Sequence, residues 1–141
     1  MTNMKRILSI DYGDSRTGIA VTDELRITVQ GLKTIYNKGN DKVLLKELDE
    51  ILKEYEVETI VVGMPLRLDG SKSERALITE KFIHKLKCKY NKIKIETIDE
   101  RLTTVQADKT MNELEVNPKK KKDIRDTISA VYILEAYMKK K

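Results

Sequence analysis

The stretch from Ile7 to Val21 reads ILSIDYGDSRTGIAV and places two short apolar runs on either side of a polar turn. The first run ends at Asp11, and Gly13 and Gly18 bracket the turn. Apolar runs of this length, separated by a turn that contains glycine, are typical of neighbouring β-strands. We therefore predict two strands, with the carboxylate of Asp11 presented where the first strand ends.

Outward from this pair, the sequence alternates between strand and helix patterns. Residues 27–35 form a third apolar run, which predicts a third strand. Apolar residues then recur at three- and four-residue spacing from 40 to 55, as in an amphipathic helix. Residues 59–62 are apolar on both faces, which favours a strand buried between two layers. Ser71 and Glu74 form a capping-box pattern that opens a second helix. The predicted buried stripe of that helix consists of Ile78, Phe82, Ile83 and Leu86.

The last third of the chain continues the alternation. Residues 93–98 predict a fifth strand, which runs into the acidic pair Asp99-Glu100. Residues 103–106 repeat the capping-box pattern, so a third helix is expected directly after that pair. A proline and a run of lysines separate it from a last helix, which is expected to begin at about Asp123.

The order of the elements predicts the fold class. Strands that are joined through helices lie parallel to one another in most sheets, whereas the first three strands form an antiparallel meander. We therefore predict an α/β fold with a mixed five-stranded sheet, three antiparallel strands plus two parallel ones, flanked by helices. The 141 residues suit one hydrophobic core, so residues 1–141 are expected to form a single domain.

Composition narrows the classes of protein. Hydrophobic residues make up 40% and charged residues 36%, which is typical of a folded domain. The sequence contains no apolar run of membrane-spanning length, no secretory signal pattern, and one cysteine, Cys88. We therefore expect a cytoplasmic protein without a disulfide. The net charge of +5 favours a polyanionic partner, and the lack of tryptophan disfavours a stacking platform for single strands.

Three carboxylates are placed where they can act together. Asp11 and the pair Asp99-Glu100 fall at predicted strand ends, where open α/β sheets hold their ligands. Asp126 lies on the apolar stripe of the last helix and is expected to have a cation or hydrogen-bond partner there. Phosphodiester hydrolysis commonly uses two divalent ions about 4 Å apart, held by such oxygen ligands. The pattern therefore predicts a two-metal Mg²⁺ or Mn²⁺ site formed by Asp11, Glu100 and Asp126.

Each acid also has an ordinary structural interpretation. Asp11 could accept backbone hydrogen bonds in a turn before Gly13. Asp126 could be a first-turn acid of a helix that Asp123 caps. Residues 99–101 could form a solvated ion-pair cluster. Only the joint placement of the acids favours a catalytic site.

Four motifs in this order resemble the YqgF/RuvX family over the whole chain. They are IDYGDSRTGIAV at 10–21, VGMPL at 62–66 with DGS at 69–71, DERLTT at 99–104, and DTISAVYIL at 126–134. The resemblance implies a ribonuclease H-like fold related to the RuvC junction resolvases. It also implies a nuclease that matures the 5′ end of pre-16S ribosomal RNA, while an older proposal for the family is Holliday junction resolution.

The resemblance implies roles for the acids. Asp11 matches the first-strand acid of the family, Glu100 with Asp99 beside it matches the acidic pair, and Asp126 matches the acid of the C-terminal helix. All four are therefore candidate catalytic residues. Because adjacent residues of a strand point to opposite faces, only one of Asp99 and Glu100 is expected to face the metals.

Basic residues are the candidates for nucleic-acid binding. Arg16 and Arg101 match the basic residues of the family and are expected to hold a phosphate, or alternatively to form structural ion pairs. A solvated loop is the alternative for the lysine run, which consists of Lys119, Lys120, Lys121 and Lys122. The expected partner is structured RNA, pre-16S rRNA above all, or branched DNA. The protein is expected to be a monomer or a homodimer.

Two other classes of protein remain to be weighed against a nuclease. Asp11-Tyr12-Gly13 followed by Thr17-Gly18 also resembles the phosphate-binding hairpin of sugar kinases and actin-like ATPases. Those enzymes close two domains around the nucleotide, which 141 residues do not supply. A non-catalytic module that binds nucleic acid or a ribosome-assembly partner is the other alternative, and the sequence leaves it open.

Overall fold

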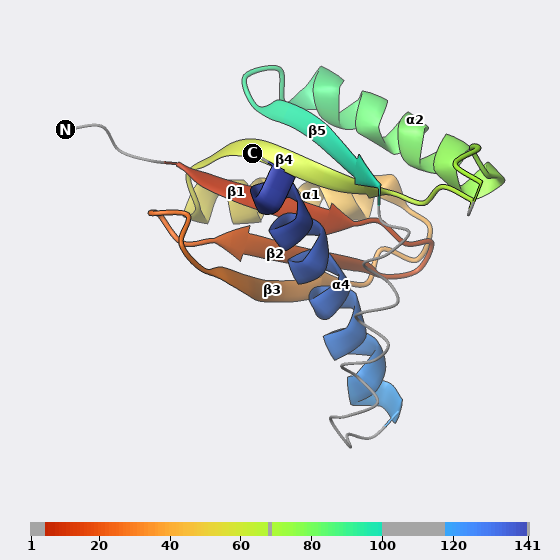
Figure 1. The fold of residues 1–141 in the computed structure, drawn as a ribbon, viewed down its shortest axis with the longest axis horizontal. Coiled ribbons are helices and arrows are strands. Elements are labelled where there is room, and N and C mark those ends of the chain that lie inside the picture. The colour runs from red at the N-terminus through yellow and green to blue at the C-terminus, as the bar shows by residue number, and fades with distance from the viewer. Residues whose placement is uncertain (1–4, 68, 100–117, 141) are drawn as a thin grey trace.

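The structure is a computed structural model that describes residues 5–67, 69–99 and 118–140, with the backbone alone described for 118–125 and 140. Its elements, in chain order, are β1 (Arg6–Asp11), β2 (Thr17–Thr22), β3 (Val29–Ile35), α1 (Asp41–Glu54), β4 (Val57–Met64), α2 (Glu74–Lys89), β5 (Lys94–Asp99) and α4 (Pro118–Lys140) (Figure 1). The third strand begins at Val29, two residues later than predicted.

One mixed sheet forms the centre of the molecule. Its strand order is β3-β2-β1-β4-β5. β1 pairs antiparallel with β2, and β2 antiparallel with β3, whereas β4 runs parallel to both β1 and β5. The predicted α/β fold, with a three-stranded antiparallel meander and two parallel strands, is therefore confirmed.

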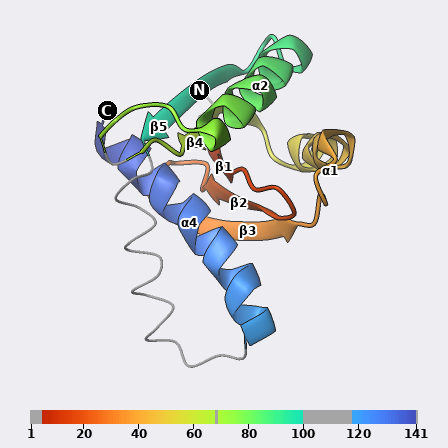
Figure 2. The same ribbon diagram turned by 90° about the vertical axis from the view of Figure 1, so that its right-hand side faces the viewer.

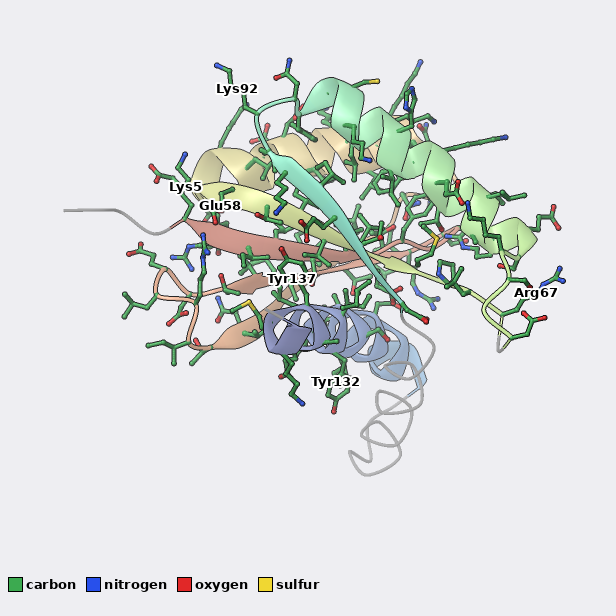
Figure 3. All side chains as sticks on the ribbon, turned by 45° about the horizontal axis from the view of Figure 1, so that its top comes forward. Lys5, Glu58, Arg67, Lys92, Tyr132 and Tyr137 are labelled. Atoms are coloured by element: carbon green, nitrogen blue, oxygen red, sulfur yellow. The ribbon has the colours of Figure 1, made fainter. Side chains whose placement is uncertain are left out.

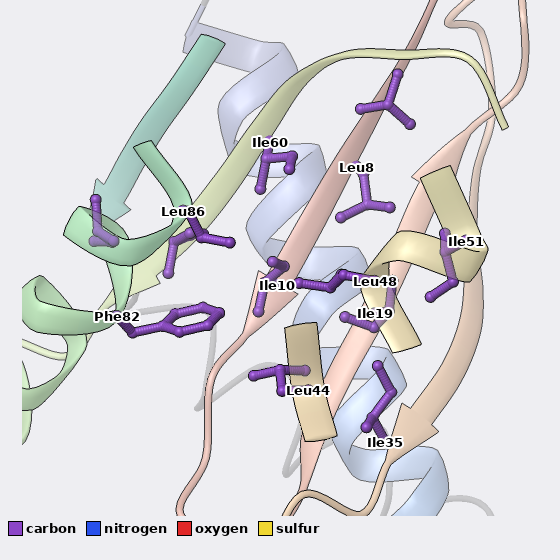
Figure 4. Close-up of a cluster of buried hydrophobic side chains, with 13 residues drawn as sticks. Leu8, Ile10, Ile19, Ile35, Leu44, Leu48, Ile51, Ile60, Phe82 and Leu86 are labelled. Carbon is purple, nitrogen blue, oxygen red and sulfur yellow. The ribbon is translucent and has the colours of Figure 1, made fainter. Parts of the chain in front are cut away.

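Helices cover the two faces of this sheet separately. α1 and α2 lie on one face and α4 crosses the other (Figure 2). Alternate residues of β1 serve the two cores: Leu8 and Ile10 pack toward α1 and α2, while Ile7 packs toward α4. The close-up of the larger core shows Ile10 near Leu44 of α1 and Phe82 of α2 (Figure 4). Odd-numbered residues of β1 therefore face α4, and even-numbered residues face α1 and α2.

The start of α2 differs from the prediction. Ser73, not Ser71, is the N-cap, and its hydroxyl accepts a hydrogen bond from the backbone N–H of Ala76. Ser71 instead bonds to the carboxylate of Asp69 in the preceding turn. Phe82, Ile83 and Leu86 are buried as predicted, whereas Ile78 is exposed and Ala76 and Thr79 are buried in the first turns instead.

The last helix starts earlier than predicted. α4 begins at Pro118, because proline at the first helical position costs no hydrogen bond and already has a helical φ. The lysine run 119–122 therefore lies in the first turns of α4, and the prediction of a loop there is wrong. The helix expected after Thr103 lies outside the described residues. In the described part of the chain, no helix combines the length and apolar character that crossing a bilayer requires.

Candidate active site

Asp11 ends β1 on the face that α4 covers. Ile7 belongs to the α4 core, and the hydroxyl of Ser9 donates a 2.6 Å hydrogen bond to the backbone carbonyl of Ala130 on α4. Strand alternation places Asp11 on the same face. The side chain is half-buried, and its Cα lies opposite that of Gly18 on β2. The end of β1 therefore presents a carboxylate toward α4.

Gly18 lets α4 lie directly on the sheet beside Asp11. A Cβ at Gly18 would be 2.0 Å from the backbone oxygen of Asp126, a distance no side chain tolerates. Gly31 on β3 lies under the next residue of the helix, where a Cβ would be 3.0 Å from Cβ of Thr127. Asp11 and Asp126, far apart in the sequence, are thus placed at adjoining positions on one face of the sheet.

The remaining contacts of α4 fix its rotation about its own axis. The buried stripe of the helix consists of Ala130, Ile133, Leu134 and Tyr137, as predicted. Tyr137 points toward the sheet and Tyr132 away from it (Figure 3). Ser9 adds the hydrogen bond to Ala130 one turn beyond Asp126. Sequence analysis did not single out Ser9, because a serine within an apolar strand carries no sign of its partner.

Asp126 has the cation partner that its place on the apolar stripe predicts. Nε of Arg16 donates a 2.8 Å hydrogen bond to Oδ2 of Asp126, and the two side chains are 32% and 15% exposed. Because the helix begins at Pro118, Asp126 lies well inside it, and the interpretation as a first-turn acid capped by Asp123 is wrong. The ion pair expected as one alternative for Arg16 is present, while its contact with a phosphate stays a prediction.

The turn after Asp11 is attached to both helices of the opposite face. The ring of Tyr12 stacks on Phe82 with centroids 4.2 Å apart, and its hydroxyl donates a 2.6 Å hydrogen bond to Asp41 at the start of α1. Arg75 of α2 lies over the same ring, donates to the carbonyl of Tyr12 at 2.7 Å, and pairs with Asp14. Burial, and then the bond to Asp41, raise the pKa of Tyr12 well above its ordinary value.

The candidates in the second half of the chain are only partly described. Ile95 packs in the α1 and α2 core and Ile98 in the α4 core, so Asp99 points to the α1 and α2 side, away from Asp11. Asp99 is exposed at the end of β5. Glu100 and Arg101 lie outside the described residues. The lysines 119–122 are placed by the backbone of α4 alone.

The described donors suit a hard divalent cation. Carboxylate oxygens are the ligands that Mg²⁺ and Mn²⁺ prefer, and Asp11 and Asp126 supply two carboxylates on one face. Among residues 5–67, 69–99 and 118–140, no three His, Cys, Asp or Glu side chains gather into a metal-holding group. Glu100, the predicted third carboxylate ligand, lies outside the described residues.

A mixed five-stranded sheet of this order, with helices on both faces, is the ribonuclease H-like fold. Residues 5–140 match the RuvX family, which is described as a Holliday junction resolvase. The chain belongs to the RuvX family of nucleases, which are hydrolases of phosphodiester bonds.

Relatives and solved structures agree with this assignment. A protein of Ruminiclostridium cellulolyticum is 48% identical over 133 residues, covering 94% of this chain and 93% of the relative. A protein of Acetivibrio thermocellus is 45% identical over 136 residues, covering 96% of each chain. Both carry the name "Putative pre-16S rRNA nuclease". RuvC of T. thermophilus, solved in complex with a Holliday junction substrate, has the same fold at a TM-score of 0.55 and 12% identity, covering 95% of this chain and 96% of that one.

Proposed function

We propose that this chain is a metal-dependent endonuclease that trims the 5′ end of pre-16S rRNA. The observation that carries the proposal is the placement of Asp126 beside Asp11, which the bare backbone of Gly18 allows. Two relatives that cover nearly the whole chain carry the name of a pre-16S rRNA nuclease, which supports the choice of substrate. The basic net charge of +5 favours a polyanionic substrate in the same way.

The proposed roles follow from where the side chains lie. Asp11, Asp126 and Glu100 would hold two Mg²⁺ or Mn²⁺ ions, with Glu100 preferred over Asp99 because Asp99 points to the opposite face. Bound there, the ions would lower the pKa of an attacking water and offset charge on the leaving oxygen. Arg16 keeps the carboxylate of Asp126 oriented and, being 32% exposed, can also reach a phosphate. Arg101 and the lysines of the run 119–122 would hold the nucleic-acid backbone.

Resolution of Holliday junctions is the second candidate function. The description of the matched family favours it, because the family is described as a Holliday junction resolvase. A junction has two equivalent strands to cut, so this function suits a homodimer, whereas trimming one RNA end suits a monomer. We propose the cytoplasm as the compartment for either activity.

The test is a cleavage assay with matched substrates and variants. A 5′-extended pre-16S rRNA fragment, a four-way DNA junction and unstructured single-stranded RNA are incubated with Mn²⁺, Mg²⁺ or EDTA. Wild type is compared with Asp11→Asn and with Asp99→Asn, which removes an exposed acid of the opposite face. We expect metal-dependent cutting of the rRNA precursor at its mature 5′ end, loss of cutting in Asp11→Asn, and near-normal cutting in Asp99→Asn.

The other outcomes separate the alternatives. Preferential cutting of the four-way junction would replace rRNA maturation by junction resolution. Binding of the rRNA precursor without cutting under any condition, with Asp11→Asn binding as wild type does, would favour the non-catalytic module. A loss of cutting in Asp99→Asn equal to that in Asp11→Asn would overturn the proposed ligand set.

A further inference from the structure

The turn between Asp11 and Arg16 is organised from within by a buried amide, Asn37, which follows β3. Nδ2 of Asn37 donates to the backbone carbonyls of Gly13 at 3.1 Å and of Asp14 at 3.3 Å. Oδ1 of Asn37 accepts a hydrogen bond from the hydroxyl of Thr17 at 3.1 Å. The side chain of Asn37 is 1% exposed, so these bonds are made without competition from water.

Only a carboxamide satisfies all the partners of this site. The two carbonyls can only accept hydrogen bonds, so the group facing them must be the NH₂. The hydroxyl of Thr17 accepts from the backbone N–H of Gly13 at 3.4 Å and donates its proton to Oδ1 of Asn37. Asp, Leu or Ala at position 37 would remove the side-chain donor to the partly buried carbonyls of Gly13 and Asp14, which weakens the turn.

The backbone around Asn37 supports the same turn. The N–H of Lys38 donates to the carbonyl of Ser15 at 3.1 Å, and the N–H of Gly39 donates to that of Asp14 at 2.5 Å. Gly39 has a φ of +74°, a conformation that suits glycine. The turn therefore rests on residues 37–39 over much of its length.

We propose that Asn37 is a positioning residue of the nuclease: by fixing the turn from Gly13 to Thr17, it sets the relative positions of Asp11 and Arg16. The inference rests on the proposed function, because it assigns the turn to the active site. Asp11 precedes the turn by two residues, and Arg16 within it holds Asp126. Loosening the turn therefore changes the relative positions of Asp11, Arg16 and Asp126, although none of the three is substituted.

The experiment compares a polar and an apolar replacement with a matched control. Asn37→Leu keeps the branching and the number of side-chain heavy atoms but removes the donors and the acceptor. Thr17→Val removes the linking hydroxyl, whereas Thr17→Ser keeps it. Thr22→Val is the control: Thr22 is fully buried and its hydroxyl accepts from the N–H of Ile7, at the other end of β1. Each variant is measured for thermal unfolding, Mn²⁺ affinity, hydrogen exchange of residues 12–17, and single-turnover cleavage.

Asn37→Leu and Thr17→Val are expected to speed exchange in residues 12–17, weaken Mn²⁺ binding, and lower the cleavage rate at saturating substrate by about tenfold or more. Thr17→Ser is expected to behave as wild type. Thr22→Val is expected to lower the unfolding temperature similarly, with Mn²⁺ affinity and cleavage rate unchanged. If Asn37→Leu loses only thermal stability, as Thr22→Val does, the inference is overturned while the proposed function stands. If wild type neither binds Mn²⁺ nor cuts, the proposed function fails and the inference falls with it.

Discussion

The placement of Asp126 next to Asp11 depends on Gly18. It lies opposite Asp11 in the β1 and β2 ladder, and the backbone of Asp126 occupies the space that a side chain would fill. The neighbouring contact at Gly31 is looser, because the nearest atom there belongs to the side chain of Thr127 rather than to backbone. The approach of α4 to the sheet is therefore set by a glycine on β2.

Gly18→Ala is expected to push α4 away from β2 and to destabilise the fold by about 1 to 3 kcal/mol, the usual cost of forcing an extra carbon into a packed site. Mn²⁺ affinity should fall as well, because a shift of the backbone of Asp126 also moves its carboxylate relative to Asp11. Gly31→Ala is the control and should have the smaller effect on both. Urea unfolding and metal titration measure the two quantities, and equal effects of the two substitutions would contradict this account.

At the scale of elements, Tyr12 joins the turn after β1 to both helices of the opposite face. Its ring lies against Phe82 of α2 and its hydroxyl bonds to Asp41 of α1, which also accepts from Lys85 at 2.8 Å. The strand end that carries Asp11 is thereby attached to α1 and α2 on one side and to α4 on the other. Three helices thus contribute to the placement of one carboxylate.

Tyr12→Phe keeps the stacking and removes the hydrogen bond to a carboxylate, so we expect a loss of about 1 to 3 kcal/mol in the free energy of unfolding. The folded-state pKa of Tyr12 is raised above its ordinary value of about 10. Its stabilising contribution is therefore fully present below about pH 10 and lost as the pH rises beyond that value.

Wild type should consequently lose stability faster than Tyr12→Phe as the pH rises above about 10. Denaturant unfolding of both proteins from pH 8 to 11 measures this difference, and the buried Tyr90 and Tyr137 are common to the two. Parallel curves through the alkaline range would contradict the assigned role of the hydroxyl.

The sequence predicts the elements better than their contacts. Apolar periodicity locates the strands and α1, because burial on one face or both leaves a direct pattern in the residues. Ser71 fits the capping-box pattern with Glu74, whereas the observed N-cap, Ser73, has Ala76 three residues later, so the pattern selects the wrong serine. The start of α4 was placed at Asp123 because its lysines suggested a solvated loop, whereas Pro118 opens the helix.

In the candidate site too, the sequence predicts some contacts and not others. The stripe on α4 predicts a cation or hydrogen-bond partner for Asp126, and Arg16 is that partner. Ser9 and Asn37 could not be predicted, since each bonds to backbone atoms distant in the sequence, and backbone groups carry no residue signature. Strand alternation places Asp99 on the α1 and α2 side, because Ile98 lies in the α4 core, and the metal-binding role of Glu100 stays a prediction.

At the scale of the whole molecule, the basic charge is concentrated in part on the first turns of α4. Four of the first five residues of α4 are lysines, and a helix N-terminus favours negative charge. A bound polyanion would offset the charge of the lysines and lie at the positive end of the helix dipole. We therefore keep the prediction that this end of α4 contacts the backbone of the nucleic acid.

Changing Lys119, Lys120, Lys121 and Lys122 to glutamine is expected to weaken binding of the rRNA precursor and of DNA alike. The slope of the logarithm of the binding constant against that of salt concentration should shrink by up to about 3, since each phosphate contact contributes roughly 0.7 to 0.9. The charge-matched control changes four exposed lysines of α1 and α2, which are Lys42, Lys46, Lys53 and Lys87. Equal weakening of nucleic-acid binding in both variants would show that net charge alone, and not this end of α4, accounts for the effect.

The central claim is that Asp11 and Asp126 hold a divalent cation together. It is tested most directly by titrating the free protein with Mn²⁺ and measuring binding by calorimetry or electron paramagnetic resonance. Wild type is expected to bind Mn²⁺, Asp11→Asn and Asp126→Asn to bind it at least about tenfold more weakly, and Asp99→Asn to bind it as wild type does. Absence of binding in wild type, or a loss in Asp99→Asn as large as that in Asp126→Asn, would contradict the account.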